Sequence, residues 1–364
     1  MRPIAKSMEL PPYPKIACAP HFYPDSPYTH SLCAEGRCTM ASRAHTAVLA
    51  VAMAASALSA PFAGAAETTY PVRPIRYLVG FVPGGSNDIM ARIVGQKLTE
   101  SWGQPVVVDN RPGAGGNLAA GLLARTTPDG YTFMNISAAH AISQTLYTNL
   151  SYSLERDLTP VVLLGNSPLI MVVNAGVPAD SVAELVGVAK KRQLIYASGG
   201  IGVISHLAME MFKVAAKIDA THVPYKGIGP TVPALISGEA HVTMNAMPAL
   251  LPHTKAGKLR AIGALTEKRH PLLPEVPTFI EQGYKEFVMG NWTGIVAPAK
   301  TPRPIINQLA IEITRILRTP EITQRLVDTG LDPLGGTPEE FGKLIRSEIA
   351  RFGKAVKDSG AKAD

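Results

Sequence analysis

The sequence predicts an α/β protein built from two similar units with a ligand cleft between them. Three observations carry this prediction. Short β-rich runs alternate with helical patterns from residue 75 onward, the alternation starts again after Pro178, and two apolar segments link the units. Such alternation is typical of largely parallel sheets covered by helices. Ligands of these sheets bind beyond the carboxyl ends of the strands, which places the expected site between the units.

The first 66 residues are expected to be absent from the mature protein. From Met40, a short polar start is followed by an apolar run over 47–60 and by Ala63-Gly64-Ala65, which is the pattern of a secretory signal peptide. We therefore assign 40–66 to a signal peptide that directs the protein to the periplasm. Residues 1–39 are interpreted as a leader from a mis-called start, because a signal peptide does not normally follow a polar, proline-rich segment of that length.

The composition argues against several classes of site. With 364 residues, 46% hydrophobic and 17% charged, the chain can bury an ample core. All three cysteines precede residue 40, and the later histidines are scattered, so neither a disulfide framework nor a metal or cofactor is expected. Lys and Arg residues are also scattered, without the basic stripe of a nucleic-acid-binding protein, while the mildly positive net charge that remains after removal of residues 1–66 favours anionic ligands.

In the first unit, strands are expected over 76–82, 106–109 and 131–136. Apolar residues at helical spacing follow the first two of these strands: Ile89, Ile93, Val94 and Leu98, then Leu118, Leu122 and Leu123. Each strand meets its helix through a short loop rich in glycine or serine.

The second unit repeats this order, with strands expected over 194–197, 221–225, 241–245 and 260–265 and helices near 205–216 and 230–237. The C-terminal region returns to helix. A helix cap and an N1 proline are provided twice, by Thr319-Pro320 and by Thr337-Pro338. Glu340 completes a capping box with Thr337. One apolar stripe follows, made of Phe341, Ile345, Ile349 and Phe352.

Two apolar segments, 161–173 and 292–297, are expected to cross between the units as paired strands. Two lobes with two connections make a hinge. We assign 67–166 plus 293–364 to the first lobe and 167–292 to the second.

Four loops join a strand to a helix and offer free backbone amides. The first covers 81–88, with Ser86 or Asn87 as the expected N-cap; Asp88 and Arg92, four residues apart, are expected to pair with each other. Amides and the dipole at a helix N-terminus favour a carboxylate or phosphate. An ordinary tight turn is the alternative interpretation.

The other loops cover 111–117, 198–206 and 224–229. The loop over 111–117 resembles a dinucleotide fingerprint, but Leu118 stands where that motif requires glycine, and no P-loop Lys-Ser/Thr follows. In the last loop Tyr225 and Lys226 offer polar contacts, although Lys226 could equally be a solvated charge.

Enzyme signatures are poor. There is no H-E-x-x-H motif, and 165–169 lacks the final glycine of a nucleophile elbow. Ser205 and His206 form the one adjacent nucleophile and base near the expected cleft, but neighbouring residues at a helix start usually diverge. A hydrolase or transferase acting in the cleft therefore remains a minor alternative.

At these loops the sequence resembles the Bug-type extracytoplasmic solute receptors of tripartite tricarboxylate transporters. The matching stretches span nearly the whole mature chain in a fixed order: 70–76 (YPVRPIR), 81–88 (FVPGGSND), 103–116 (GQPVVVDNRPGAGG), 128–132 (PDGYT), 223–227 (VPYKG), 257–261 (GKLRA), 276–278 (VPT) and 297–298 (AP).

The resemblance implies a type II periplasmic-binding-protein fold, with a hinge and an interlobe cleft that closes on one small carboxylate. It implies ligand contacts from the first lobe at Pro83, Gly84, Gly85, Ser86, Ala114, Gly115, Gly116, Ser137 and His140. From the second lobe it implies contacts at Ser198, Gly199, Gly202, Ser205, Tyr225, Lys226 and Asn245.

The function expected from the resemblance is capture of a small mono- or dicarboxylate, which could be aromatic, by a monomeric receptor without catalytic activity that delivers it to membrane permease subunits. Asn245 stands where similar receptors often carry aspartate, and a neutral amide favours a ligand without an amino group. Use of the same receptor by a signalling partner is the alternative that the sequence does not separate.

Overall fold

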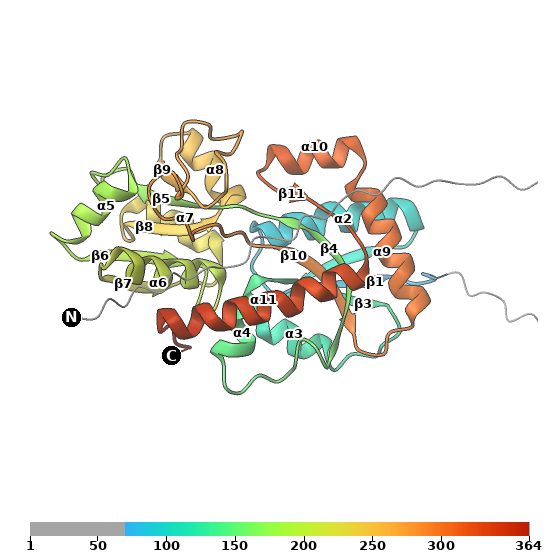
Figure 1. Ribbon diagram of the computed structural model, residues 1–364. Coiled ribbons are helices and arrows are strands. Elements are labelled where there is room, and N and C mark those ends of the chain that lie inside the picture. The colour runs from blue at the N-terminus through green and yellow to red at the C-terminus, as the bar shows by residue number, and fades with distance from the viewer. Residues whose placement is uncertain (1–69, 364) are drawn as a thin grey trace, which may run out of the picture. The chain divides into compact units, whose positions relative to one another are not determined.

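A computed structural model describes residues 70–363 and forms two α/β lobes, each built on its own sheet (Figure 1). The predicted signal peptide and leader lie outside the described residues. Among the described residues, no helix is both long and apolar enough to cross a membrane.

The first sheet has six strands in the order β11-β4-β10-β3-β1-β2. Its strands are β1 (Ile75–Val79), β2 (Val106–Asn110), β3 (Thr132–Ser137), β4 (Leu158–Asn166), β10 (Thr293–Pro298) and β11 (Asp332–Pro333). The accompanying helices are α2 (Ser86–Trp102), the 3-10 turn η1 (Ala114–Gly116), α3 (Asn117–Leu123), α4 (Ala138–Leu146), α9 (Arg303–Leu317), α10 (Pro320–Asp328) and α11 (Pro338–Ser359).

The second sheet has five strands in the order β7-β6-β8-β5-β9. Its strands are β5 (Leu169–Asn174), β6 (Leu194–Ser198), β7 (Ala220–Pro224), β8 (Val242–Ala246) and β9 (Leu259–Ala264). The helices of this lobe are α5 (Val182–Ala189), α6 (Ile204–Ala216), α7 (Ile228–Ser237) and α8 (Met247–Lys255).

The two-lobed α/β fold is therefore confirmed, but the expectation of largely parallel sheets is wrong. β1 pairs in parallel with β2 and β3, and β6 with β7 and β8. β10 and β5, the strands that come from the crossovers, pair antiparallel with their neighbours. Both sheets are mixed because the chain enters each lobe from the side of the other lobe, against the direction of the strand–helix units.

The apolar segment 161–173 was expected to be one strand, yet it forms the end of β4 and most of β5, which belong to different sheets. The chain changes sheet at Ser167 and Pro168, where proline lacks the N–H group that a continuous ladder needs. The two crossovers do pair: Ser167 N donates to Asn291 O at 3.2 Å, and Asn291 N donates to Ser167 O at 2.9 Å. This short antiparallel ladder joins the lobes.

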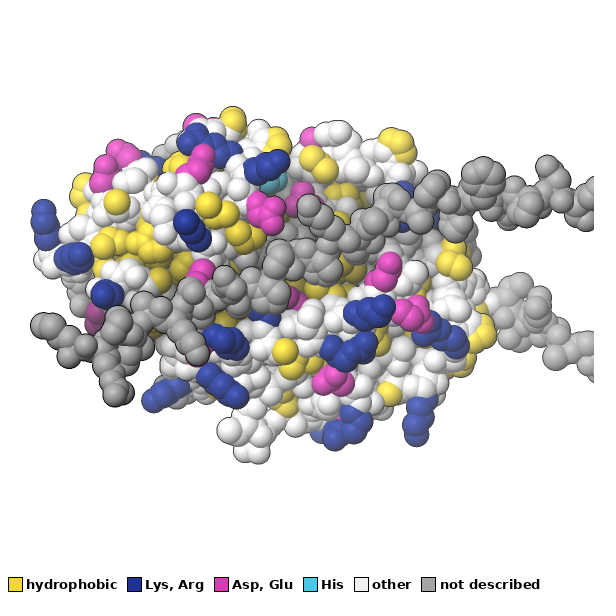
Figure 2. Space-filling view, viewed as in Figure 1, with side chains coloured by type: hydrophobic (Ala, Val, Ile, Leu, Met, Phe, Trp, Pro, Cys, Tyr) yellow, Lys and Arg dark blue, Asp and Glu magenta, His cyan; other side chains and the backbone are white. Residues whose placement is uncertain are grey.

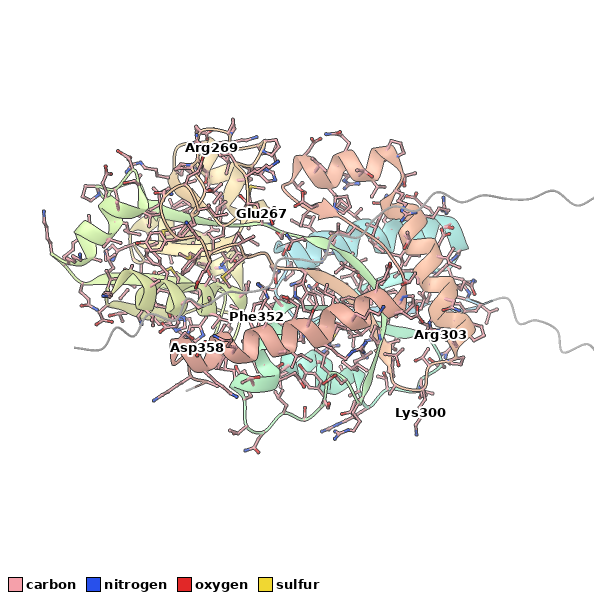
Figure 3. All side chains as sticks on the ribbon, viewed as in Figure 1. Glu267, Arg269, Lys300, Arg303, Phe352 and Asp358 are labelled. Atoms are coloured by element: carbon pink, nitrogen blue, oxygen red, sulfur yellow. The ribbon has the colours of Figure 1, made fainter. Side chains whose placement is uncertain are left out.

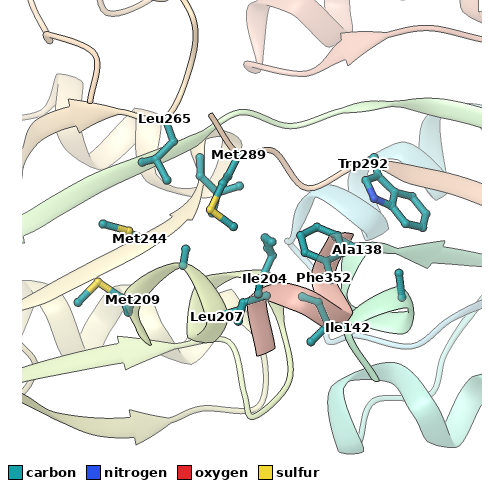
Figure 4. Close-up of a cluster of buried hydrophobic side chains, with 14 of the residues drawn as sticks. Ala138, Ile142, Ile204, Leu207, Met209, Met244, Leu265, Met289, Trp292 and Phe352 are labelled. Atoms are coloured by element: carbon teal, nitrogen blue, oxygen red, sulfur yellow. The ribbon is translucent and has the colours of Figure 1, made fainter. Parts of the chain in front are cut away.

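One buried apolar cluster continues from the first lobe into the second (Figure 4). Ile142 of α4 lies in it with Ile204 and Leu207 of α6, and Phe352 from the C-terminal half of α11 (labelled in Figure 3) packs among them. The predicted capping box starts α11, because Thr337 Oγ1 accepts from Glu340 N at 3.2 Å and Glu340 Oε2 accepts from Thr337 N at 2.9 Å. The C-terminal helix thus adds an apolar contact between the lobes beside the two crossovers.

Phe352→Ala should lower the free energy of unfolding by about 3–5 kcal/mol, since it removes a fully buried ring from this shared cluster and leaves a cavity. Urea unfolding followed by circular dichroism measures the loss. Ile311→Ala is the control, because Ile311 is 70% exposed and its truncation should change stability by no more than about 0.5 kcal/mol. A loss at Phe352 below about 1 kcal/mol would show that the shared cluster is not tightly packed.

Candidate ligand-binding site

A cavity of about 60 Å³ lies between the lobes, lined by residues from both sheets. Its wall is made largely of residues at the N-terminal ends of five described helices, α2, α4, α6, α7 and α8. The lining residues are Phe81, Val82, Gly85, Ser86, Asn87, Ser137, Ala139, Gly199, Val203, Ile204, Ser205, Gly227, Ile228, Asn245, Ala246, Ala249 and Asn291.

No charged side chain lines this cavity, so the backbone at the helix ends is its main source of charge. The first N–H groups of a helix have no intrahelical partner, and the helix dipole adds partial positive charge there. One such end stabilises an anion by about 0.3–1 kcal/mol, and five ends around one small volume reinforce one another. The arrangement fits a small anion held by neutral donors.

Two buried side chains in the wall have polar atoms without a hydrogen-bond partner. Ser137 Oγ comes from the end of β3 in the first lobe, and Asn245 Nδ2 comes from β8 in the second. Both residues are less than 8% exposed. Because buried polar atoms are nearly always hydrogen-bonded, these two atoms are available to bond a molecule in the cavity.

Glycines allow the facing loops to approach each other closely. Gly227 has a φ of 107°, and a Cβ atom there would lie 2.6 Å from Cγ2 of Val82 in the other lobe. A Cβ atom at Gly85 would lie 3.3 Å from Cγ2 of Ile228, also across the cleft. The absence of a side chain at these positions permits the close contact between the lobes.

A second cavity of about 580 Å³ adjoins the first and shares Phe81, Gly199 and Gly227 with it. It is formed by η1 with the loops after β6 and β7, and includes Tyr225 and Lys226. Tyr225 already donates its hydroxyl to Glu239 Oε1 at 2.8 Å.

The structure distributes the predicted contact residues over these two cavities. The first holds Gly85, Ser86, Ser137, Gly199, Ser205 and Asn245. The second holds Ala114, Gly115, Gly116, Gly199, Tyr225 and Lys226. Neither cavity is lined by Pro83, Gly84, His140, Ser198 or Gly202. Their direct contact with a ligand remains a prediction.

Three of these remaining residues hold the loops in place. Ser198 Oγ lies 2.6 Å from His222 Nε2 and accepts from Gly200 N at 3.2 Å. Gly202 N donates to His206 Nδ1 at 3.3 Å. His140 Nδ1 accepts from Ser137 N at 3.1 Å, and burial lowers the pKa of His140 to about 4, so that its ring is neutral at pH 7.

The start of α2 differs from its prediction. The N-cap is Gly85 rather than Ser86 or Asn87, and no side chain caps the helix. Asp88 pairs with Arg92 at 2.9 Å as predicted, and it also accepts from Gly84 N at 3.1 Å. Burial would raise the pKa of Asp88, but hydrogen bonds from Arg92, Asn110 and Gly84 lower it below its usual value. This carboxylate is therefore ionised and already fully engaged.

Sequence reasoning missed two asparagines in the cavity wall. Asn87 belongs to the loop over 81–88, so its polar side chain and its position at a helix start could have identified it as a contact candidate. Asn291 lies in the second crossover and donates from Nδ2 to Ser86 Oγ at 3.3 Å. Only the pairing of the two crossovers brings it to the cavity.

The nucleophile and base required for a hydrolase are not brought together. Ser205 Oγ accepts from Gly199 N at 3.1 Å, whereas His206 Nδ1 faces Gly202 N and its ring stacks on His222 at 4.4 Å. Within residues 70–363, no group of three His, Cys, Asp or Glu side chains could hold a metal ion.

Residues 90–361 match the protein family described as tripartite tricarboxylate transporter family receptor. The chain belongs to this family. The receptor is 36% identical to protein BugT of Bordetella pertussis over 320 residues, covering 87% of this chain and 97% of BugT.

Solved structures agree with this assignment. The R. palustris protein Rpa4515 with adipate has a TM-score of 0.78 and 34% identity, covering 80% of this receptor and 99% of that chain. MatC from Rhodopseudomonas palustris with bound malate has a TM-score of 0.76 and 31% identity, covering 79% and 100%. Periplasmic binding protein BugD has a TM-score of 0.78 at 29% identity, covering 80% and 99%.

Gly85→Val should weaken ligand binding by about tenfold or more, because the added side chain meets Ile228 across the cleft and stands between the ligand and the start of α2. Calorimetric titration with a carboxylate ligand measures the change. Gly187→Val is the matched control, since a Cβ atom at Gly187 meets nothing within 4 Å. Equal affinity of the Gly85 variant and the control would place the ligand away from α2.

Proposed function

We propose that this receptor is a periplasmic solute-binding protein that captures a small carboxylate and delivers it to the permease subunits of a tripartite tricarboxylate transporter. In this proposal the protein acts as a monomer, has no catalytic activity and needs no cofactor. Its lobes, 67–166 plus 293–364 and 167–292, close on the ligand about the paired crossovers.

The observation that carries the proposal is the convergence of five helix N-termini on one cavity between the lobes, whose wall also contains Ser137 Oγ and Asn245 Nδ2, two buried atoms without a hydrogen-bond partner among the described residues. The helix ends and the polar side chains of that wall supply hydrogen-bond donors and partial positive charge, and a carboxylate supplies acceptors with negative charge. Contributions from both lobes also explain how a ligand would stabilise closure, because the ligand gains contacts that only the closed form offers.

The side chains of the wall narrow the ligand class. An amino acid carries an ammonium group that needs an acidic partner, and no Asp or Glu lines the cavity. Asn245 presents an amide there, with Oδ1 already accepting from Ala246 N at 2.9 Å and Nδ2 free. We therefore propose a mono- or dicarboxylate without an amino group. Adipate and malate, bound by two relatives, are compounds of this class.

The distribution of charged side chains on the visible face does not favour a nucleic-acid partner. Lys and Arg are interspersed with Asp and Glu on the visible face (Figure 2). Presentation of the closed form to a signalling protein would use the same cleft and remains the alternative proposal.

Thermal unfolding with a panel of aliphatic dicarboxylates, tricarboxylates, aromatic carboxylates and amino acids tests the proposal. A carboxylate that binds only the folded protein should raise its stability by about 2.7 kcal/mol at a hundredfold excess over its dissociation constant. Amino acids should give no shift. Stabilisation by amino acids alone would contradict the proposed ligand class, and turnover of any compound would contradict the absence of catalysis.

Asn245→Asp should weaken carboxylate binding by at least about tenfold, because it replaces a free amide donor with a negative charge beside the bound anion. The affinity is measured by titration at pH 7. Asn307→Asp makes the same change on the exposed surface of α9 and should leave the affinity unchanged. If Asn245→Asp binds carboxylates as well as the unmodified protein, Asn245 does not face the ligand.

A further inference from the structure

Two side chains of the second crossover hydrogen-bond to residues of the loop over 81–88, at the start of α2. Thr293 Oγ1 donates to Asn87 Oδ1 at 2.8 Å, and Asn291 Nδ2 donates to Ser86 Oγ at 3.3 Å. All four residues are less than 9% exposed. Ser86 and Asn87 line the small cavity, whereas Thr293 does not.

These two hydrogen bonds fix which atoms of the loop remain free. The hydroxyl of Thr293 has Asn87 Oδ1 as its one hydrogen-bond partner among the described residues, so its proton is directed there. The backbone oxygen of Asn87 accepts from Asn135 Nδ2 at 2.8 Å. With both of its oxygens engaged, Asn87 has its two side-chain N–H donors left.

The hydrogen-bonding role of the Ser86 hydroxyl is also fixed by the second crossover. The Nδ2 group of Asn291 can only donate, so the Ser86 oxygen is the acceptor in their hydrogen bond. The hydroxyl proton of Ser86 is then free to be donated elsewhere.

We propose that Thr293, together with Asn291, is a positioning residue that sets Asn87 and Ser86 as hydrogen-bond donors toward the cavity, and thereby makes the site prefer an anion to a neutral molecule of the same shape. The inference rests on the proposed function and adds to it the residues that determine this preference.

Because Asn291 and Thr293 lie in the segment that joins the lobes, the preference for an anion depends on the conformation of that segment. Asn291 forms the backbone ladder with Ser167 at the crossover, and Thr293 opens β10 beside Ser137 of β3. Donor orientation at the loop is therefore imposed by the segment that joins the lobes. A rearrangement of this segment would release Asn87 and Ser86 and reduce the preference for an anion.

The test compares acetate with acetamide, a neutral molecule of nearly the same shape, as probes of the purified protein. Without the Thr293 hydroxyl, the Asn87 amide can rotate and present its oxygen to the ligand. Thr293→Val should therefore weaken acetate binding by about tenfold while acetamide changes by less than about twofold. Nuclear magnetic resonance titrations, followed on the side-chain amide signals of asparagine, give both affinities.

Two further variants separate positioning from general damage. Thr293→Ser keeps the hydroxyl and should retain the preference for acetate. Thr301→Val removes another buried threonine hydroxyl of the first lobe, which donates to Pro298 O at 2.8 Å beyond the far end of β10, and should leave the preference intact. An unchanged ratio of affinities in Thr293→Val, or an equal loss in Thr301→Val, would overturn the inference.

The two proposals fail in different ways. If the unmodified protein binds neither acetate nor any carboxylate of the panel, the proposed function is wrong and this inference falls with it. If the unmodified protein binds carboxylates and prefers acetate, but Thr293→Val does so to the same extent, the function stands and only the role of Thr293 is wrong.

Discussion

The N-terminal ends of five described helices border one small cavity, and the partial positive charge of these helix ends is the electrostatic constraint on the rest of the site. Donors brought together without acceptors are unfavourable unless negative charge lies among them. Neutral side chains add to the donors rather than balance them, since Ser137 and Asn245 contribute atoms that also lack partners. A small anion, the ligand class that we propose, would supply this negative charge without a Lys or Arg in the wall.

Because the hydrogen-bond donors of the cavity come from both lobes, ligand binding is expected to depend on how the lobes are arranged. The lobes meet through glycine loops at the cleft, through the paired crossovers at Ser167 and Asn291, and through the apolar cluster around Phe352. Burial of apolar side chains such as Ile142 and Leu207 supplies a contact that does not depend on the ligand. In the proposed function the ligand adds polar contacts from both lobes, which makes closure depend on the ligand.

In our proposal the segment that crosses between the lobes also contributes to ligand recognition. Through Asn291 and Thr293 it hydrogen-bonds to the loop that begins α2, so it both connects the lobes and orients cavity side chains. A hydrogen bond has a donor and an acceptor. When one bond fixes which group donates, it also determines what the partner group can still donate or accept. This is how we propose that a wall without charged side chains discriminates between ligands by their charge.

The sequence by itself determined the α/β class, the two repeats and the strand–helix loops, and it predicted an anion-binding site at these loops. These follow from local rules, because hydrophobic periodicity defines the elements and glycine-rich helix starts expose amides. The pairing of Asp88 with Arg92 and the capping box of Thr337 with Glu340 were predicted correctly because each depends on spacing within one helix. Only the tertiary structure decided the mixed direction of the sheets, the division of the predicted contacts between two cavities, and the place of Asn291 and Thr293 at the first loop. Ser86 and Asn291 are separated by 205 residues, and no local pattern specifies a contact that exists only after two crossovers have paired.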